Sequence, residues 1–405
     1  RFKSLSKVES FFKLMTSNCH ESSLKNYFYW LHLFFALKRI FKKSFEYQYM
    51  LSAQSVSIFG HLRTICLILS TFLIQNLCIA QNIQFYDVVI YGGTSAGVSA
   101  AIQASRMGKK VILIEPFKRI GGLTTGGLGK TDIGNKQAIG GLSREFYQNI
   151  KKYYLKPENW IYQNRESYRG VGYNTFEEDA MWAFEPSAAL KVYHEMLEKE
   201  PNIRIVYQQR LNRKTGVKKE GQVIKSIQME TGQIYQGKMF MDCTYEGDLM
   251  AASGVSYTVG REANSQYGES LNGVQANNVS LTLHKKISRN SMHHNFIEGV
   301  SPYLVKDNPK SGLLPFVSPG KPGIDGQADH KIQAYCYRMT LTDHPDNRIP
   351  FKKPIGYKEI EYELLFRNYE AAKGEISKMY DYGDPLVPWI NSEMPNRKTD
   401  TNNQK

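Results

Sequence analysis

A glycine-rich turn and one acidic residue have the types and spacing of a nucleotide site. In the stretch YDVVIYGGTSAGVSAAIQASRMGKKVILIEP, residues 86–116, the turn begins at Gly92 and ends at Gly97, with Thr94 where a second glycine is usual. Free N–H groups at the start of a helix bind phosphate oxygens. Glu115 follows Gly97 by eighteen residues, and a carboxylate in that place accepts hydrogen bonds from ribose hydroxyls and repels a 2′-phosphate. The pattern therefore predicts a dinucleotide site that disfavours NADP.

Three elements must position these residues. The β-branched run at 87–91 predicts a buried parallel strand, residues 98–108 predict a helix, and residues 109–115 predict a second buried strand. Gly92 would permit the tight turn, Gly97 would let the helix pack close to the strand, and the Thr94 hydroxyl is expected near the phosphates. A plain α/β unit with a glycine turn is the alternative. The predicted contacts are Gly92, Gly93, Thr94, Ser95, Ala96, Gly97 and Glu115.

Two later segments extend the predicted site. The sequence after Glu115 carries R-x-G-G from Arg119 to Gly122, although Leu123 stands where a second arginine is usual. Residues 203–242 predict a strand, a hairpin with turns at TGVKKEGQ and ETGQ, and a returning strand, which an acidic turn and a helix follow. The further predicted contacts are Arg119, Gly121, Gly122, Thr125, Asp242, Thr244, Gly247 and Asp248.

These segments resemble a family of FAD-dependent oxidoreductases, two-dinucleotide-binding flavoproteins of an exported type found in Bacteroidetes and sometimes labelled xanthan lyase. The shared blocks include DVVIYGGTSAGVSAAIQA, GGLTTGGLGKTDIG, DCTYEGDLMAASGVSYTVGREANSQYGES and MPNRKTDTNN, and the resemblance covers Tyr86 to the end. It implies FAD as the cofactor, a threonine in the glycine turn as a usual feature, and the backbone of Leu211 beside the adenine. The family continues past KTDTNN, so we expect a C-terminally truncated product.

The family is also similar to the flavin subunit of heterodisulfide reductases, whose members carry a 4Fe–4S cluster. The cysteines of this chain stand singly, which matches neither a C-x-x-C pair nor the clustered run that holds such a centre. An iron–sulfur cluster is therefore not expected, and no metal site is predicted. The five cysteines are Cys19, Cys66, Cys78, Cys243 and Cys336.

Two residues near the second glycine pair are catalytic candidates, because a bound flavin supplies the hydride chemistry and the protein binds, orients and tunes it. Asp132 is interpreted as an acid or base, or as a loop cap. Arg144 is interpreted as a contact to an anionic substrate group, or as the ion-pair partner of Glu145 or Glu185.

A second pair of catalytic candidates lies in residues 327–344, which predict one strand across the active site. Alternation on that strand would place Tyr335 and Tyr337 on one face, and Cys336 and Arg338 on the other. Arg338 is the preferred substrate contact, and His330 is a further candidate.

The predicted fold class is α/β, with a Rossmann-like FAD-binding domain of the glutathione-reductase type and an inserted or second α+β substrate domain. Residues 1–49 are interpreted as non-native upstream sequence or a disordered segment, and 50–80 as a signal peptide. The FAD-binding domain is expected to comprise 81–150 and 200–260, separated by a helical insertion at 151–199. A partial, truncated substrate domain would occupy 261–405.

The first eighty residues carry the export prediction. A polar stretch from Met50 to Arg63 precedes a ten-residue apolar run, Ile65–Ile74, and a small residue at Ala80. This is the layout of a secretory signal, and the run is too short for a stable membrane span. The mature chain is therefore expected in the periplasm or outside the cell. The net charge of +14 favours a diffuse positive surface over nucleic-acid binding.

The sequence thus predicts an exported enzyme that transfers a hydride from a small polar, sugar-like molecule to FAD and passes the electrons to an acceptor that no residue identifies. A catalytically silent flavin-binding or structural fragment is one alternative. A polysaccharide lyase that uses the flavin without redox change is the other, although no pair of carboxylates has a defensible glycosidase spacing.

Overall fold

The computed structural model describes residues 84–169, 178–275, 299–333, 337–372 and 389–403. The predicted upstream segment and signal peptide, together with Tyr335 and Cys336, lie outside the described residues.

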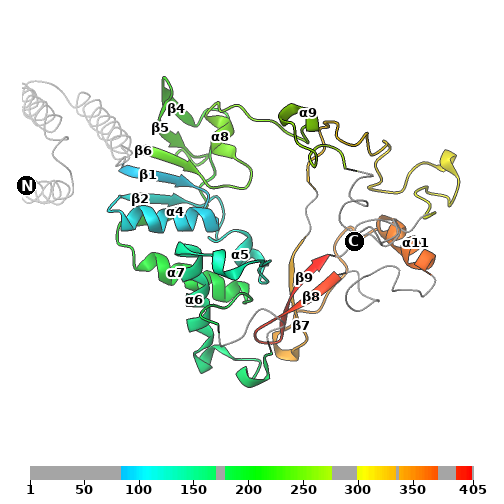
Figure 1. Ribbon diagram of the computed structural model, residues 1–405, viewed down its shortest axis with the longest axis horizontal. Helices are drawn as coiled ribbons and strands as arrows, with labels where there is room; N and C mark the ends of the chain where they lie inside the picture. The colour runs from blue at the N-terminus through cyan, green and yellow to red at the C-terminus, as the bar shows by residue number, and fades with distance from the viewer. Residues whose placement is uncertain (1–83, 170–177, 276–298, 334–336, 373–388, 404–405) are drawn as a thin grey trace, which may run out of the picture. The chain divides into compact units, whose positions relative to one another are not determined.

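A six-stranded sheet with the strand order β3-β2-β1-β6-β5-β4 forms the centre of the α/β fold (Figure 1). Strand β1 pairs in parallel with β2 and β6, and β2 pairs in parallel with β3, whereas β4, β5 and β6 form an antiparallel meander. The predicted α/β fold class is confirmed. The strands are β1 (Phe85–Tyr91), β2 (Val111–Ile114), β3 (Ile203–Val206), β4 (Val217–Glu220), β5 (Val223–Gln228) and β6 (Ile234–Asp242).

Strand β1 is buried on both faces, which explains its run of β-branched residues. Val88 and Ile90 belong to one hydrophobic cluster, and Tyr86, Val89 and Tyr91 belong to another. Successive side chains of a strand point to opposite faces, so β1 supplies apolar side chains to a core on each side of the sheet.

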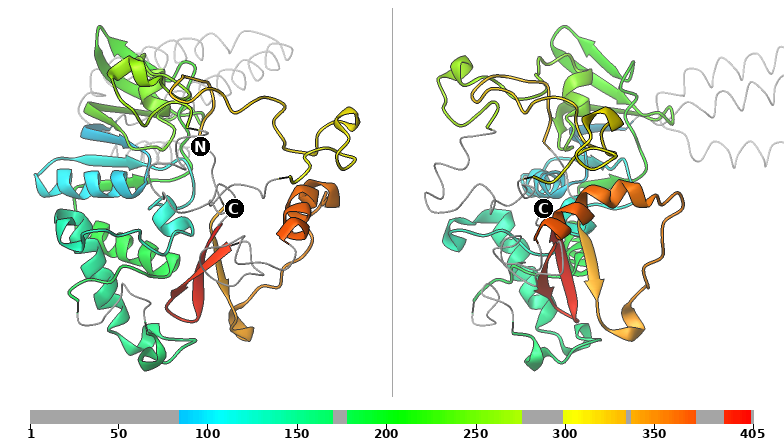
Figure 2. Two further views of the ribbon diagram at one scale, coloured as in Figure 1. Left: turned by 45° about the vertical axis from the view of Figure 1, so that its right-hand side comes forward. Right: turned by 90° about the vertical axis from the view of Figure 1, so that its right-hand side faces the viewer.

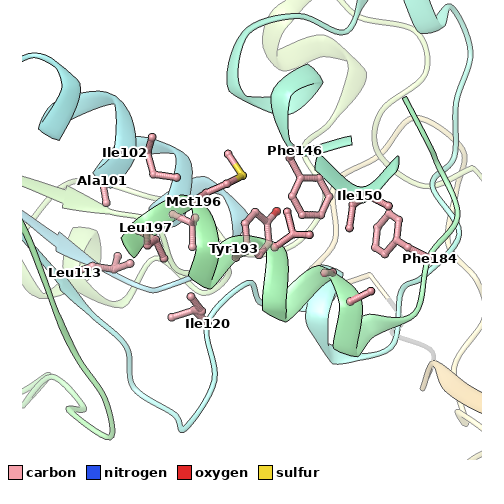
Figure 3. Packing of buried hydrophobic residues seen from close by; sticks show 14 of the residues in the cluster. Ala101, Ile102, Leu113, Ile120, Phe146, Ile150, Phe184, Tyr193, Met196 and Leu197 are labelled. Atoms are coloured by element: carbon pink, nitrogen blue, oxygen red, sulfur yellow. The ribbon is translucent and has the colours of Figure 1, made fainter. Parts of the chain in front are cut away.

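Three helices enclose one of these two cores. They are α4 (Ser95–Arg106), α6 (Gly141–Tyr154) and α7 (Pro186–Glu198). The helix α4 packs against β1, β2 and α7, and α6 packs against α7. Figure 3 shows side chains of α6 and α7 meeting in this core, where the rings of Phe146 and Tyr193 stack with their centroids 4.5 Å apart.

The hairpin after β3 differs in detail from its prediction. Strand β4 occupies VKKE, which was predicted to be part of a turn. The turn itself is confined to the next two residues, where Gly221 has a φ of +58°.

A second, three-stranded antiparallel sheet has the order β7-β9-β8 (Figure 2). The strand predicted over 327–344 is wrong in extent, because β7 spans only Met339–Thr342. Residues before it pair instead with segments earlier in the chain: Arg261 and Asp329 form an isolated bridge, and the Val274 amide donates to the Gln327 carbonyl at 2.9 Å. Gly323 and Gly326, just before this segment, have left-handed φ values of +106° and +80°, so the chain enters it from a turn. The other strands are β8 (Trp389–Met394) and β9 (Lys398–Asn403).

The remaining elements are short. The helix α11 spans Glu363–Ala372. No helix of the described residues is long and apolar enough to cross a bilayer. The other helices are α5 (Leu123–Gly126), α8 (Asp248–Ala252) and α9 (Asn264–Tyr267), and the 3₁₀ turns are Lys136–Ala138, Pro157–Asn159, Arg165–Ser167, Pro309–Ser311, Pro345–Asn347 and Glu359–Tyr362.

Replacing Gly97 with alanine is expected to destabilise the fold, although alanine normally favours a helix interior by about 1 kcal/mol. A Cβ at this position would lie 1.9 Å from the carbonyl oxygen of Gly92, and this oxygen belongs to the backbone, which cannot move aside as a flexible side chain could. We expect a loss of about 3 kcal/mol or more in the free energy of unfolding, measured by chemical denaturation. Gly134→Ala is the control, since its Cβ would meet nothing within 4 Å; equal stability of the two variants would contradict the prediction.

Candidate functional site

A cleft of about 940 Å³ opens at the carboxyl ends of β1, β2, β3 and β6. Ligands of open α/β sheets bind at this edge. Six residues predicted from the sequence line the cleft: Gly92, Thr94, Glu115, Arg119, Gly122 and Thr244. The other lining residues are Pro116, Phe117, Lys118, Leu123, Gln208, Arg210, Glu230, Thr231, Tyr245 and Glu246.

The first glycine turn brings the start of α4 to the cleft. Gly92 has a φ of +101°, and a Cβ there would lie 2.7 Å from the backbone of Cys243. Gly97 has the packing role that the sequence predicts, because only hydrogen fits beside the Gly92 carbonyl. Ser95 and Ala96 are the first two residues of α4, where amides have no acceptor inside the helix. These amides are the groups that phosphate oxygens use at helix starts.

The Thr94 hydroxyl has structural partners. It accepts a hydrogen bond from the Gly97 amide at 3.4 Å, which caps α4, and donates to the Cys243 carbonyl at 2.7 Å. The side chain therefore joins the helix start to the end of β6. A threonine here adds a cap and a cross-link between two segments, rather than only a hydroxyl for the phosphates.

Glu115 points toward the glycine turn. Its carboxylate accepts hydrogen bonds from the Gly93 amide at 2.8 Å and the Phe117 amide at 2.7 Å, and the residue is 4% exposed. Burial raises the pKa of this carboxyl, while the two amides act in the opposite direction. Each carboxylate oxygen has further acceptor capacity, so Glu115 is fixed in place and still able to accept from a ligand hydroxyl.

The second glycine pair is attached directly to the first turn. The Gly121 amide donates to the Gly93 carbonyl at 2.6 Å, and the Ser95 hydroxyl donates to the Gly121 carbonyl at 3.1 Å. Thr125, a predicted contact, is 1% exposed, and its hydroxyl donates to the Ile120 carbonyl at 2.5 Å. Thr125 thus shapes the loop from behind the cleft surface.

The turn after β6 forms the opposite wall. The Asp242 carboxylate accepts from the Thr244 amide at 3.0 Å and from the Met250 amide at 2.8 Å. The Gly247 amide donates to the Thr244 hydroxyl, and Asp248 is 3.4 Å from Arg213. Asp242, Gly247 and Asp248 therefore build and anchor the turn, while Thr244 lines the cleft.

Tyr245 is a lining residue that the sequence reasoning missed. Its hydroxyl accepts a hydrogen bond from the Leu123 amide at 2.8 Å, and a Cβ on Gly122 would lie only 2.1 Å from that oxygen. The glycine at 122 is therefore needed for this contact between the two walls. Its position next to Thr244, a predicted contact, was the signal in the sequence that could have identified it. Its hydrogen bond to Leu123 joins residues 122 positions apart, which a single sequence does not reveal.

The mouth of the cleft carries an exposed aromatic ring and three cations. The Arg210 guanidinium lies 5.5 Å from the centroid of Phe117, and Lys118 and Arg119 follow that ring in the sequence. Leu211 is buried and donates its amide to the Tyr91 hydroxyl at 2.9 Å. The side chain of its neighbour Arg210, rather than Leu211 itself, reaches the cleft.

These features fit a dinucleotide. The glycine turns let a ligand approach the backbone closely. A helix start and three cations would attract the negative charge of a diphosphate. A buried carboxylate lies beside the turn. The volume is within the range of cofactor pockets. No His, Cys, Asp and Glu group of metal-binding geometry occurs among the described residues.

Arg144 pairs with neither of the predicted glutamates. Its guanidinium forms an ion pair with Asp179 and lies 5.4 Å from the Trp182 ring. Glu145 is adjacent on α6, and neighbouring helix positions do not face each other; it pairs instead with Arg106 at 2.8 Å. Arg144 does not line the cleft, so the structure gives no support to a substrate role there.

The other catalytic candidates are also outside the cleft lining. Asp132 and His330 are exposed. Arg338 is 3.0 Å from Asp400, and that pair is nearly enclosed, with side-chain exposures of 15% and 1%. Asp400 was not among the predicted site residues. A substrate contact by Arg338 stays a prediction.

Comparison with known proteins identifies the family. The sequence model described as FAD dependent oxidoreductase matches residues 87–405. A search of curated proteins found no match.

Similar solved structures include L-proline dehydrogenase from P. horikoshii, at 14% identity over 44% of this chain and 59% of that one, with a TM-score of 0.29. L-amino acid deaminase from Proteus vulgaris has 16% identity over 44% and 57%, with a TM-score of 0.29. The chain thus spans less than two thirds of either structure. With TM-scores this low, neither bears on the site.

Replacing Thr94 with valine is expected to lower the free energy of unfolding by about 1–2 kcal/mol, because the helix loses its cap and the Cys243 carbonyl loses its donor. Thr94→Ser keeps the hydroxyl and is expected to stay within about 0.5 kcal/mol of the parent chain. Chemical denaturation of the three proteins measures the difference. A valine variant as stable as the serine variant would show that the hydroxyl contributes nothing.

Proposed function

The chain belongs to the family of FAD-dependent oxidoreductases, and we propose that the cleft holds the ADP part of FAD. The observation that carries the proposal is the Glu115 carboxylate, which is fixed by the Gly93 and Phe117 amides at the edge of an open cleft. A carboxylate in this position suits the ribose hydroxyls of an unphosphorylated adenosine.

The chain's own residues have distinct parts in this proposal. The amides at the start of α4 would face the diphosphate, and Arg119 would add positive charge. The exposed ring of Phe117, beside Arg210, would offer a flat apolar surface to the adenine. FAD, when bound, supplies the hydride chemistry.

The reaction that we propose is hydride removal from a small polar, sugar-like molecule, followed by transfer of the electrons to a separate acceptor. We also propose that the protein is exported, and the signal-like segment Met50–Ala80 supports this. Detection of Gln81 as the first residue of protein recovered outside the cytoplasm would support export, and retention of the Met50 start in that fraction would count against it.

Flavin identification tests the proposed function directly. The purified chain is expected to be yellow and to release FAD, rather than FMN, on denaturation. Anaerobic addition of single sugars or polyols is then expected to bleach the flavin absorbance with one of them. Protein that is folded but remains colourless after incubation with FAD would overturn the assignment of the cleft.

Glu115→Gln is expected to weaken FAD binding about tenfold, because the variant loses a charged acceptor for the ribose.

Burial raises the pKa of Glu115, so in the parent chain the carboxylate protonates at a higher pH than an ordinary glutamate. FAD affinity should therefore fall as the pH drops through that raised pKa, and the glutamine variant should be flat over the same window. Fluorescence titration of FAD at several pH values checks both; identical pH profiles would count against a ribose role.

A further inference from the structure

Two glycines of the loop after α5 lie so close to β8 and to the residue before β7 that a side chain would not fit at either position. A Cβ on Gly127 would lie 3.2 Å from the Arg338 carbonyl oxygen, and one on Gly129 would lie 2.1 Å from the Met394 sulfur. On its other side the loop pairs with the segment before α7, where the Phe184 amide donates to the Gly129 carbonyl at 2.9 Å. The loop is thus held between two segments distant in the sequence.

One buried oxygen joins this loop to the sheet. Oδ2 of Asp400, on β9, accepts a hydrogen bond from the Lys130 amide at 3.1 Å and one from the Arg338 guanidinium at 3.0 Å. Asp400 is 1% exposed. Burial raises the pKa of the Asp400 carboxyl, and Arg338 opposes that shift. An acceptor enclosed in this way fixes its donors more firmly than a solvated one.

The same loop leads back to the cleft. Gly122 and Leu123 line the cleft, α5 begins at Leu123, and the chain reaches Lys130 seven residues later. At the cleft end the Leu123 amide is bonded to Tyr245, and at the far end the Lys130 amide is bonded to Asp400. The segment from Gly121 to Lys130 is therefore tied at both ends.

We propose that Asp400 is a positioning residue for the cofactor cleft, acting through the Lys130 amide on the wall formed by Gly122 and Leu123. The inference rests on the proposed function, since it takes FAD as the occupant. The sheet β7-β9-β8 then contributes to cofactor binding without touching the cofactor.

A pair of double variants separates positioning from general packing. Arg338→Met with Asp400→Leu removes the buried ion pair together, which avoids leaving one charge stranded, and it also removes the acceptor for Lys130. Arg338→Met with Asp400→Asn has nearly the same shape but keeps an oxygen acceptor. Asp343→Asn, which breaks the exposed pair of Asp343 with Arg397, is the surface control.

The readouts are the dissociation constant for FAD, from flavin fluorescence, and the hydrogen-exchange rate of the Lys130 amide. The leucine double variant is expected to bind FAD about tenfold more weakly and to exchange that amide at least about tenfold faster, as loss of one buried hydrogen bond implies. The asparagine double variant and the surface control should stay within about threefold of the parent chain.

Equal FAD affinity in the two double variants, with both folded by thermal melting, would overturn the proposal. If the parent chain binds no FAD, the proposed function fails. The exchange rate of the Lys130 amide then still decides whether Asp400 holds the loop.

Discussion

The contact between the Gly92 carbonyl and Gly97 is so close that a Cβ at residue 97 would lie 1.9 Å from the oxygen. This constraint brings α4 directly onto the end of β1, so the free amides at the helix start face the sheet edge. The second glycine pair is then bonded to the first turn, and the cleft walls follow from these contacts. A side chain at 97 would force the helix start and the Gly92 carbonyl apart.

Polar groups around the cleft are largely satisfied by the protein before any ligand binds. Thr94 caps a helix, Asp242 holds the turn after β6, and Glu115 accepts two amides. Groups that are already fixed lose little conformational freedom on binding, which favours affinity. Several residues expected to touch the cofactor are thus better described as the frame that fixes the few that line the cleft.

The sequence predicted those elements whose structure depends on residues close together in the chain. Buried parallel strands require β-branched runs, and tight turns require glycine, so β1, β2, α4 and the Gly92–Gly97 turn were all predictable. The partners of charged side chains were not. Arg144 meets Asp179, Arg338 meets Asp400, and Tyr245 meets the Leu123 amide, and such long-range pairs leave no periodic signal in a single sequence. Strand β7 was overestimated because alternation alone does not show where pairing stops.

Strand β4 was misread for a reason that has its own consequence. Its sequence, VKKE, has the charged composition of a turn, yet it is the last strand of the six-stranded sheet. An outermost strand presents unpaired backbone groups that can recruit a strand from another molecule, and lysines there oppose such pairing. Lys218, Lys219 and Glu220 are all exposed. The charged residues that led to the assignment of β4 as a turn therefore also oppose self-association at this edge of the sheet.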